Sequence, residues 1–154
     1  MDTVVNTCCN HGIKKEYKDG ICFMSYCNCA AGKARRYALP EKMIEWTIKS
    51  YPGPQEAIHV AWEWLKTQTG KGIKERNSVY WQWDTPSAGW LLLEGNFGTG
   101  KTGLAVACYK VIVDRMIDAV GVVGFMTSSP RMAQFWSVSE LCKAQKETYG
   151  KDMI

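Results

Sequence analysis

The stretch EGNFGTGKTGLAVA, residues 94–107, joins a glycine-rich segment to an apolar run. The pattern Gly-x4-Gly-Lys-Thr is met by Gly95, Gly100, Lys101 and Thr102, with a further glycine between the first two. Glycines let the backbone bring its N–H groups close to phosphate oxygens. The first turn of a following helix adds unpaired N–H groups and a partial positive charge. The stretch therefore predicts a phosphate-binding loop.

The segments on either side of this loop decide between a nucleotide loop and a fortuitous glycine-rich turn. WLLLEG, residues 90–95, is a short apolar run that predicts a buried strand. KTGLAVACYKVIVDRMIDA, residues 101–119, predicts a buried helix. Because a nucleotide loop requires this order of strand, loop and helix, we favour nucleotide binding.

The expected ligand is ATP with Mg²⁺. Lys101 would reach the β- and γ-phosphates and neutralise charge there, and Thr102 would give its hydroxyl to the Mg²⁺ ion that bridges them. These two are the candidate catalytic residues. The residues expected to hold the nucleotide are Gly95, Asn96, Phe97, Gly98, Thr99, Gly100, Lys101, Thr102 and Gly103.

Clustered cysteines mark the N-terminal segment. Five of the seven cysteines lie between Cys8 and Cys29, and in a reducing compartment clustered thiols more often bind a metal than form disulfides. A structural Zn²⁺ ion takes four Cys or His ligands. The ligand set that we favour is Cys8, His11, Cys27 and Cys29. Cys9 and Cys22 are second-rank candidates for a ligand position, and thiols that bind no metal are the alternative.

Composition favours a cytoplasmic protein without a membrane span. The 154 residues are 46% hydrophobic and 22% charged, and no apolar run approaches the ~20 residues that a span needs. The N-terminus lacks the pattern of a secretory signal. The net charge is +4, and residues 1–39 hold six basic residues against three acidic ones. Such a segment attracts phosphate backbones or an acidic protein, or is simply a solvated surface.

The chain divides into three expected regions: a cysteine-rich zinc-binding module at 1–39, a linker and helix at 40–88, and a partial P-loop domain of the α/β class at 89–154. The first region lacks helical periodicity and is typical of loops. A helix is predicted from Pro54 to about Thr67. Its expected apolar face consists of Ile58, Ala61, Trp62 and Leu65.

Several residues have competing interpretations. His59 is expected to be structural or solvated, because it has no convergent partners in the sequence. Residues 72–89 are polar and turn-rich apart from three aromatics, for which core packing or covering a nucleotide is favoured over stacking on nucleic-acid bases. These three are Tyr80, Trp81 and Trp83. Cys108 and Cys142 fall in apolar helical patterns and are expected in the core.

Most of the chain resembles AAA+ ATPases of the DnaC/IstB type, which load replicative helicases or assist transposases. GWLLLEGNFGTGKTGLAVA, residues 89–107, looks like their strand, Walker A loop and helix. AQFWSVSELCKAQKETYG, residues 133–150, is similar to the next strand and helix, and ALPEKMIEWTIKSYPGPQEA, residues 38–57, resembles the linker before the ATPase core. CNCAAGKARR, residues 27–36, fits the zinc module that many members carry.

The resemblance implies an ATP-binding DNA replication accessory protein of the helicase-loader type, with a P-loop AAA+ core. Its implied partners are a replicative helicase and DNA, here single-stranded, and the intact protein is implied to be a homo-oligomer. One alternative is an IstB-like transposition helper ATPase. The other is a truncated zinc and P-loop protein that binds DNA or a partner without hydrolysing ATP. What the zinc module touches is left open by its residues.

The sequence also departs from this family. AVGVVGFMTSSPRM, residues 119–132, is longer and more apolar than the corresponding connection. No apolar strand ending in acidic residues (Walker B), sensor residue or arginine finger is recognised before Ile154. We therefore expect the N-terminal portion of a longer ATPase, or the remnant of one. For these residues alone we expect at best weak nucleotide binding and negligible hydrolysis.

Overall fold

The computed structural model describes residues 12–75, 78–84 and 89–128, together with residues 140, 142, 143 and 145. The strands are β1 (Ile13–Lys18), β2 (Ile21–Tyr26), β3 (Gly70–Glu75) and β4 (Ser78–Trp83). The helices are α1 (Ala30–Tyr37), α2 (Glu41–Ile44), the short 3-10 helix η1 (Ile48–Ser50), α3 (Gln55–Thr67) and α4 (Lys101–Ser128). A mixture of helices and strands, as expected, is confirmed. Over the described ranges, no helix combines the length and the hydropathy that a membrane span requires.

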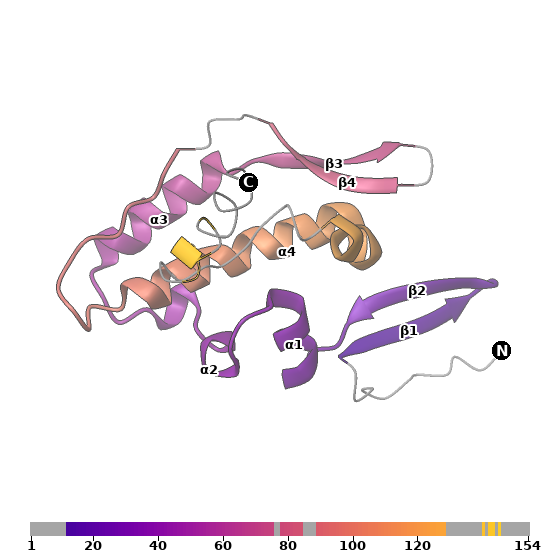
Figure 1. The fold of residues 1–154 in the computed structure, drawn as a ribbon, viewed down its shortest axis with the longest axis horizontal. Coiled ribbons are helices and arrows are strands. Elements are labelled where there is room, and N and C mark those ends of the chain that lie inside the picture. Colours follow the sequence, from indigo (N-terminus) through magenta and orange to yellow (C-terminus); the bar gives the residue numbers. More distant parts are fainter. Residues whose placement is uncertain are drawn as a thin grey trace, which may run out of the picture.

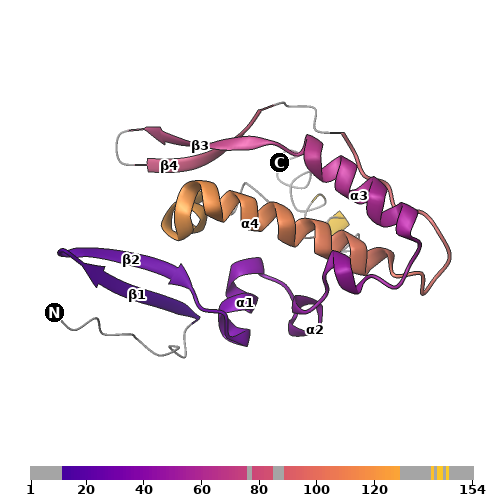
Figure 2. The same ribbon diagram turned by 180° about the vertical axis from the view of Figure 1, so that it is seen from behind.

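Helix α4 is the central element. In Figure 1, α3 and the β3–β4 hairpin lie on one side of α4, and α1 and α2 lie on the other; Figure 2 shows the same order from behind. Between Leu104 and Val120 this helix buries residues on several of its faces. A helix with apolar residues around its circumference is stable only when it is covered on more than one side.

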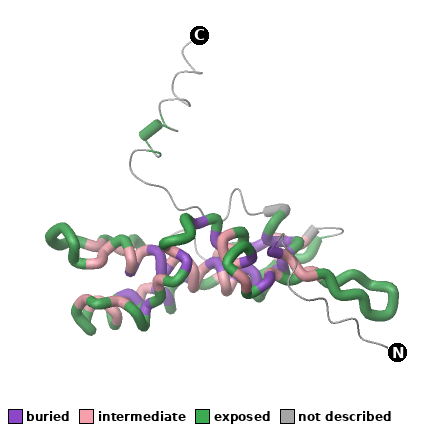
Figure 3. Tube along the Cα trace, turned by 90° about the horizontal axis from the view of Figure 1, so that it is seen from below, coloured by how far each residue is buried: buried purple, intermediate pink, exposed green. Residues whose placement is uncertain are grey.

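Two hydrophobic clusters share α4. The larger cluster joins α4 to α1 and β4, and it comprises Tyr37, Leu39, Trp81, Val106, Val113, Met116, Ile117, Val120, Val122 and Phe125. The smaller cluster lies between α4 and α3, and it comprises Ile48, Ala61, Leu65, Leu104, Ala107 and Cys108. The view in Figure 3 shows buried segments in the middle of the molecule and exposed segments at its ends.

The two helices predicted from periodicity are confirmed. α3 spans Gln55–Thr67, and the helix expected from Lys101 is present but extends to Ser128. The predicted apolar face of α3 is wrong at Trp62, which is 40% exposed, whereas Ala61 and Leu65 are fully buried. The reason is that the face of α3 in the smaller cluster is formed by Ala61 and Leu65 with the partly buried Ala57, Ile58 and Trp64, so Trp64 and not Trp62 packs there.

Cys108 and Cys142 have different environments. Cys108 is buried in the smaller cluster, as expected, and burial raises the pKa of its thiol to about 11. Cys142 is exposed, so the expectation that it is a core residue is wrong. Its described helical neighbours Glu140, Lys143 and Gln145 are exposed as well, and this turn therefore presents a polar surface.

Residues 12–39 form a hairpin and a helix instead of the expected loops. β1 pairs with β2 antiparallel, with Ile13 opposite Tyr26 and Lys18 opposite Ile21. The two residues between the strands, Asp19 and Gly20, have φ of 52° and 79°. Asp-Gly with two positive φ angles is the preferred two-residue connection of a β-hairpin. Strand pairing therefore organises this segment, although its sequence has no clean alternation of apolar and polar residues.

A second hairpin occupies the segment expected to be turn-rich. β3 pairs with β4 antiparallel, from Gly70 opposite Trp83 to Glu75 opposite Ser78. Trp81 is 9% exposed and belongs to the larger cluster, and Trp83 packs against it. Core packing of these two aromatics is thus confirmed, and their burial against α4 explains why a polar segment forms strands.

The strand expected at residues 90–95 is not formed. This segment has no regular secondary structure and pairs with no strand in the described part of the chain, whose sheets are the two hairpins alone. Leu91 and Leu93 pack against the smaller cluster, while Trp90 and Leu92 are 100% and 77% exposed. Apolar residues alone do not make a parallel strand, because its backbone groups also need neighbouring strands.

Candidate functional site

The glycine-rich loop leads directly into α4. Gly95, Gly98 and Gly100 have φ of 140°, 82° and 81°, which other residues rarely adopt. A Cβ atom at Gly100 would lie 3.0 Å from Cε2 of Tyr51, so the loop packs closely on that ring. Positive-φ glycines just before a helix N-terminus are typical of loops whose backbone N–H groups bind an anion. This geometry suits an anion.

Lys101 places a positive charge against the same loop. Its ammonium donates to the backbone oxygens of Gly95 at 2.7 Å and Asn96 at 2.6 Å, and to Oγ1 of Thr99 at 3.2 Å. The Thr99 hydroxyl donates in turn to the oxygen of Asn96 at 2.9 Å. Phosphate oxygens form stronger bonds with an ammonium than neutral carbonyls do. An anion arriving at the loop can therefore compete for this cation.

A cavity of about 580 Å³ lies between the loop and the segment that precedes α3. Its lining residues are Trp46, Thr47, Ser50, Tyr51, Pro52 and residues 97–103. The first five give one wall with two aromatic rings, and the loop gives the other. The Tyr51 hydroxyl joins the walls by donating to the backbone oxygen of Thr99 at 3.3 Å. The cavity has the volume of a small-molecule site, with an apolar wall facing polar groups.

Lys110 fixes the aromatic wall to α4. Its Nζ donates to the backbone oxygens of Ile44 and, at 2.9 Å, of Trp46, and it lies 5.1 Å from the centre of the Tyr37 ring. Burial lowers the pKa of Lys110. Because two carbonyls accept from one ammonium, the backbone that carries Trp46 is held beside the first turns of α4.

A second polar contact joins α1 to α4. The Tyr37 hydroxyl donates to Oδ2 of Asp114 at 3.2 Å, and Arg36 forms an ion pair with Oδ1 of the same carboxylate at 2.8 Å. Burial raises the pKa of Asp114, and burial together with this carboxylate raises the pKa of Tyr37 to about 12. None of these three residues lines the cavity; their contacts hold α1 against α4.

Two of the four favoured zinc ligands fall within the described residues. Cys27 is buried and its backbone N–H donates to the oxygen of Gly12 at 2.9 Å. Sγ of Cys29 accepts from the backbone N–H of Gly32 at 3.4 Å and caps α1. Cys8, Cys9 and His11 lie outside the described residues. Among those that are described, no group of three or more Cys, His, Asp or Glu side chains could hold a metal ion.

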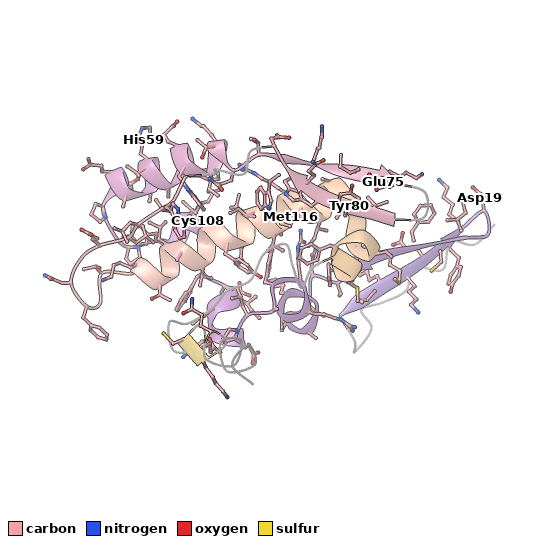
Figure 4. The ribbon with its side chains drawn as sticks, turned by 45° about the horizontal axis from the view of Figure 1, so that its top comes forward. Asp19, His59, Glu75, Tyr80, Cys108 and Met116 are labelled. Carbon is pink, nitrogen blue, oxygen red and sulfur yellow. The ribbon has the colours of Figure 1, made fainter. Side chains whose placement is uncertain are left out.

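The remaining candidates do not meet at the cavity. Cys22 is exposed on β2 and His59 is exposed on α3, where the adjacent Glu63 pairs with Lys66 at 2.6 Å. The Tyr80 hydroxyl donates to Glu75 on the neighbouring strand. Figure 4 shows His59 on α3 far from Tyr80 on the β3–β4 hairpin. The solvated role expected for His59 agrees with its exposure.

The motif identified the loop but missed the opposite wall. Trp46, Tyr51 and Pro52 lie in a segment that the sequence suggested only as a linker. The available signal was weak: two aromatics beside a Pro-Gly-Pro turn. Lys110 gave no signal at all, since its partners Ile44 and Trp46 are more than 60 positions away in the chain.

No protein-family model matches this chain, and neither a curated protein nor a solved structure is similar to it.

Proposed function

We propose that this chain binds ATP with Mg²⁺ at residues 95–103, as part of a P-loop AAA+ core. The observation that carries the proposal is the Lys101 ammonium, held by three loop oxygens beside the N-terminus of α4. A cation, glycine-shaped backbone and a helix N-terminus at one place are complementary to a polyphosphate. The wider proposal is an accessory factor of the helicase-loader type, acting on a replicative helicase and single-stranded DNA.

The cavity suggests how the nucleotide lies. Lys101 would exchange its carbonyl partners for β- and γ-phosphate oxygens, and Thr102 in the first turn of α4 would hold the Mg²⁺ ion. The rings of Trp46 and Tyr51 on the opposite wall offer an apolar surface to the base. Binding would therefore draw the segment before α3 and the start of α4 together.

Binding without turnover by this chain is favoured by the composition of the cavity wall. None of its described lining residues is an Asp or a Glu, whereas hydrolysis requires a group that positions water and a second carboxylate for Mg²⁺. In this second form of the proposal, ATP is a ligand that controls assembly on DNA or on a protein partner. The two forms share the same binding step.

Titration calorimetry with Mg²⁺-ATP tests that step. Wild type is expected to bind, and Lys101→Ala is expected to weaken binding at least about tenfold, as loss of a charge-assisted contact predicts. Lys71→Ala on exposed β3 is the matched control and should bind as wild type does. Equal affinity of the Lys101 variant, or no binding by wild type, contradicts the proposal. Phosphate release in the same samples separates its two forms.

We also propose a structural Zn²⁺ ion held by Cys8, His11, Cys27 and Cys29. This ligand set is supported by the backbone hydrogen bond from Cys27 to Gly12, which brings the two ends of the β1–β2 hairpin together. His11 directly precedes Gly12 in the chain, and Cys29 follows Cys27 by two positions. Backbone N–H groups that donate to sulfur, as Gly32 does to Cys29, suit a metal-bound thiolate.

Metal analysis of the purified chain tests the zinc proposal. We expect one zinc per chain in wild type and in Cys142→Ser, whose residue is exposed and remote in sequence from the candidate ligands. Cys27→Ser and Cys29→Ser should each lose the metal, because a structural site needs all four ligands. Zinc retained by both variants, or absent from wild type, would show that these thiols do not ligate it.

A further inference from the structure

The β1–β2 hairpin extends away from the rest of the protein. Figure 1 shows it as an arm beside α4, Figure 4 places Asp19 at its end, and Figure 3 shows exposed residues along it. Only its base is anchored, through Tyr26, which packs against the larger cluster. From Lys15 to Phe23 every residue is exposed. Two strands without a covered face gain little stability of their own, so this arm is suited to contact another molecule.

The arm carries exposed apolar side chains and positive charges on both of its faces. Tyr17, Ile21 and Phe23 are 74%, 59% and 54% exposed. Tyr17 pairs with Cys22 and Phe23 with Glu16, and neighbouring pairs point to opposite faces of a hairpin. Each face therefore presents one exposed aromatic ring, and Tyr26, at the base of the Tyr17 face, packs against the larger cluster.

Lysines accompany both rings. Lys15 is two residues from Tyr17 and shares its face, and Lys18 lies opposite Ile21 on the face of Phe23. In the described part of the protein, neither of these two lysines forms an ion pair. Counting Lys14 with them, three lysines exceed the two carboxylates of the hairpin, Glu16 and Asp19.

We infer that this hairpin binds single-stranded DNA, with bases stacked on Tyr17 and Phe23 and phosphates held by Lys15 and Lys18. Exposed rings interleaved with cations are complementary to a strand whose bases are unpaired. A flexible single strand can place bases on both faces of the arm, whereas the bases of a duplex are already stacked on each other. The inference rests on the DNA partner in the proposed function and assigns its contact surface.

Fluorescence anisotropy with a labelled oligothymidylate tests the assignment. Tyr17→Ala combined with Phe23→Ala should weaken binding by about tenfold or more, as the loss of two stacking contacts predicts. Trp62→Ala removes a partly exposed ring from α3 and should leave affinity unchanged. Lys15→Ala and Lys18→Ala should each lower the slope of log affinity against log salt by about 0.7. Lys71→Ala and Lys74→Ala on β3 are their controls.

The same variants distinguish the competing occupants. Circular dichroism and Mg²⁺-ATP affinity equal to wild type would show that the fold and the nucleotide site are intact, so a loss of DNA binding belongs to the hairpin. No oligothymidylate binding by wild type overturns the inference, as does unchanged binding by the double aromatic variant. Equal, hairpin-dependent binding of a duplex overturns its single-strand form. A dimer that Phe23→Ala dissociates, without any effect on DNA binding, would show instead that a second copy covers the arm.

Discussion

Two lysines of α4 contact different parts of the chain. Both are partly buried: Lys101 at the start of the helix donates to loop oxygens, whereas Lys110 donates to the backbone of Ile44 and Trp46. The motif predicts a phosphate-binding role for Lys101, because the spacing of its glycines and lysine is that of a phosphate-binding loop. The contacts of Lys110 join distant parts of the chain, and no local sequence pattern predicts them.

Tyr37 gives the structure a testable dependence on pH. Burial and Asp114 raise its pKa to about 12, against about 10 in an unfolded chain. The folded state therefore keeps the proton longer, and the stability that Tyr37 contributes is complete below pH 10 and is lost as pH rises towards 12. Between pH 9 and 11.5, the unfolding free energy of wild type should fall by about 1–2 kcal/mol more than that of Tyr37→Phe. Urea denaturation of both proteins measures this difference.

Tyr37→Phe is a close control because it keeps the ring that packs in the larger cluster. It removes only the hydroxyl that bonds Asp114, at a cost of about 1 kcal/mol near neutral pH. Other groups that titrate above pH 9 are common to both proteins and cancel. Parallel loss of stability in the two proteins would show that Tyr37 is not perturbed.

At the scale of elements, helices were easier to predict than strands. Pro54 and the apolar spacing of residues 58–65 located α3, and the run after Lys101 located α4. The strands of both hairpins were missed, because their stability comes from cross-strand pairing and from Trp81 against α4. Asp19–Gly20 was an available signal for the first hairpin. For residues 90–95 the apolar run indicated burial correctly only at Leu91 and Leu93.

Helix α4 (Lys101–Ser128) is interrupted by a kink at Gly121, whose backbone angles are not helical. Its φ of 71° and ψ of 168° fall in a region open to glycine alone, and no atom lies within 4 Å of a Cβ built there. Gly121→Ala should therefore destabilise the protein by about 1–3 kcal/mol through backbone strain, without a steric clash. Thermal or urea unfolding measures the loss.

Gly103→Ala is the matched control for helix propensity. Gly103 lies in the first turn of α4, and a Cβ there would meet Cε3 of Trp46 at 3.8 Å, an ordinary contact. This variant should be as stable as wild type or slightly more so. If Gly121→Ala proved as stable as Gly103→Ala, the break would not be required by the fold.

At the scale of the whole molecule, α4 connects the candidate site to the rest of the protein. Its first turn borders the loop, its middle contacts α1 through Asp114, and its last part packs under β4. The motif predicted where a phosphate could bind, and the cysteine spacing predicted a metal site that still awaits its test. The aromatic wall and the projecting hairpin were seen only in the structure, because their local signals, the aromatics near the Pro-Gly-Pro turn and the Asp19–Gly20 turn, do not say where these segments lie relative to α4.

Amide NMR spectra of the ¹⁵N-labelled chain, recorded with and without Mg²⁺-ATP, test the central claim most directly. We predict the largest shifts at the backbone amides of residues 98–103 and at the indole N–H of Trp46, and no such shifts in Lys101→Ala. These signals report the two walls of one cavity independently. Unchanged spectra, or shifts confined to residues away from the loop, would contradict the claim that this glycine-rich loop is a nucleotide site.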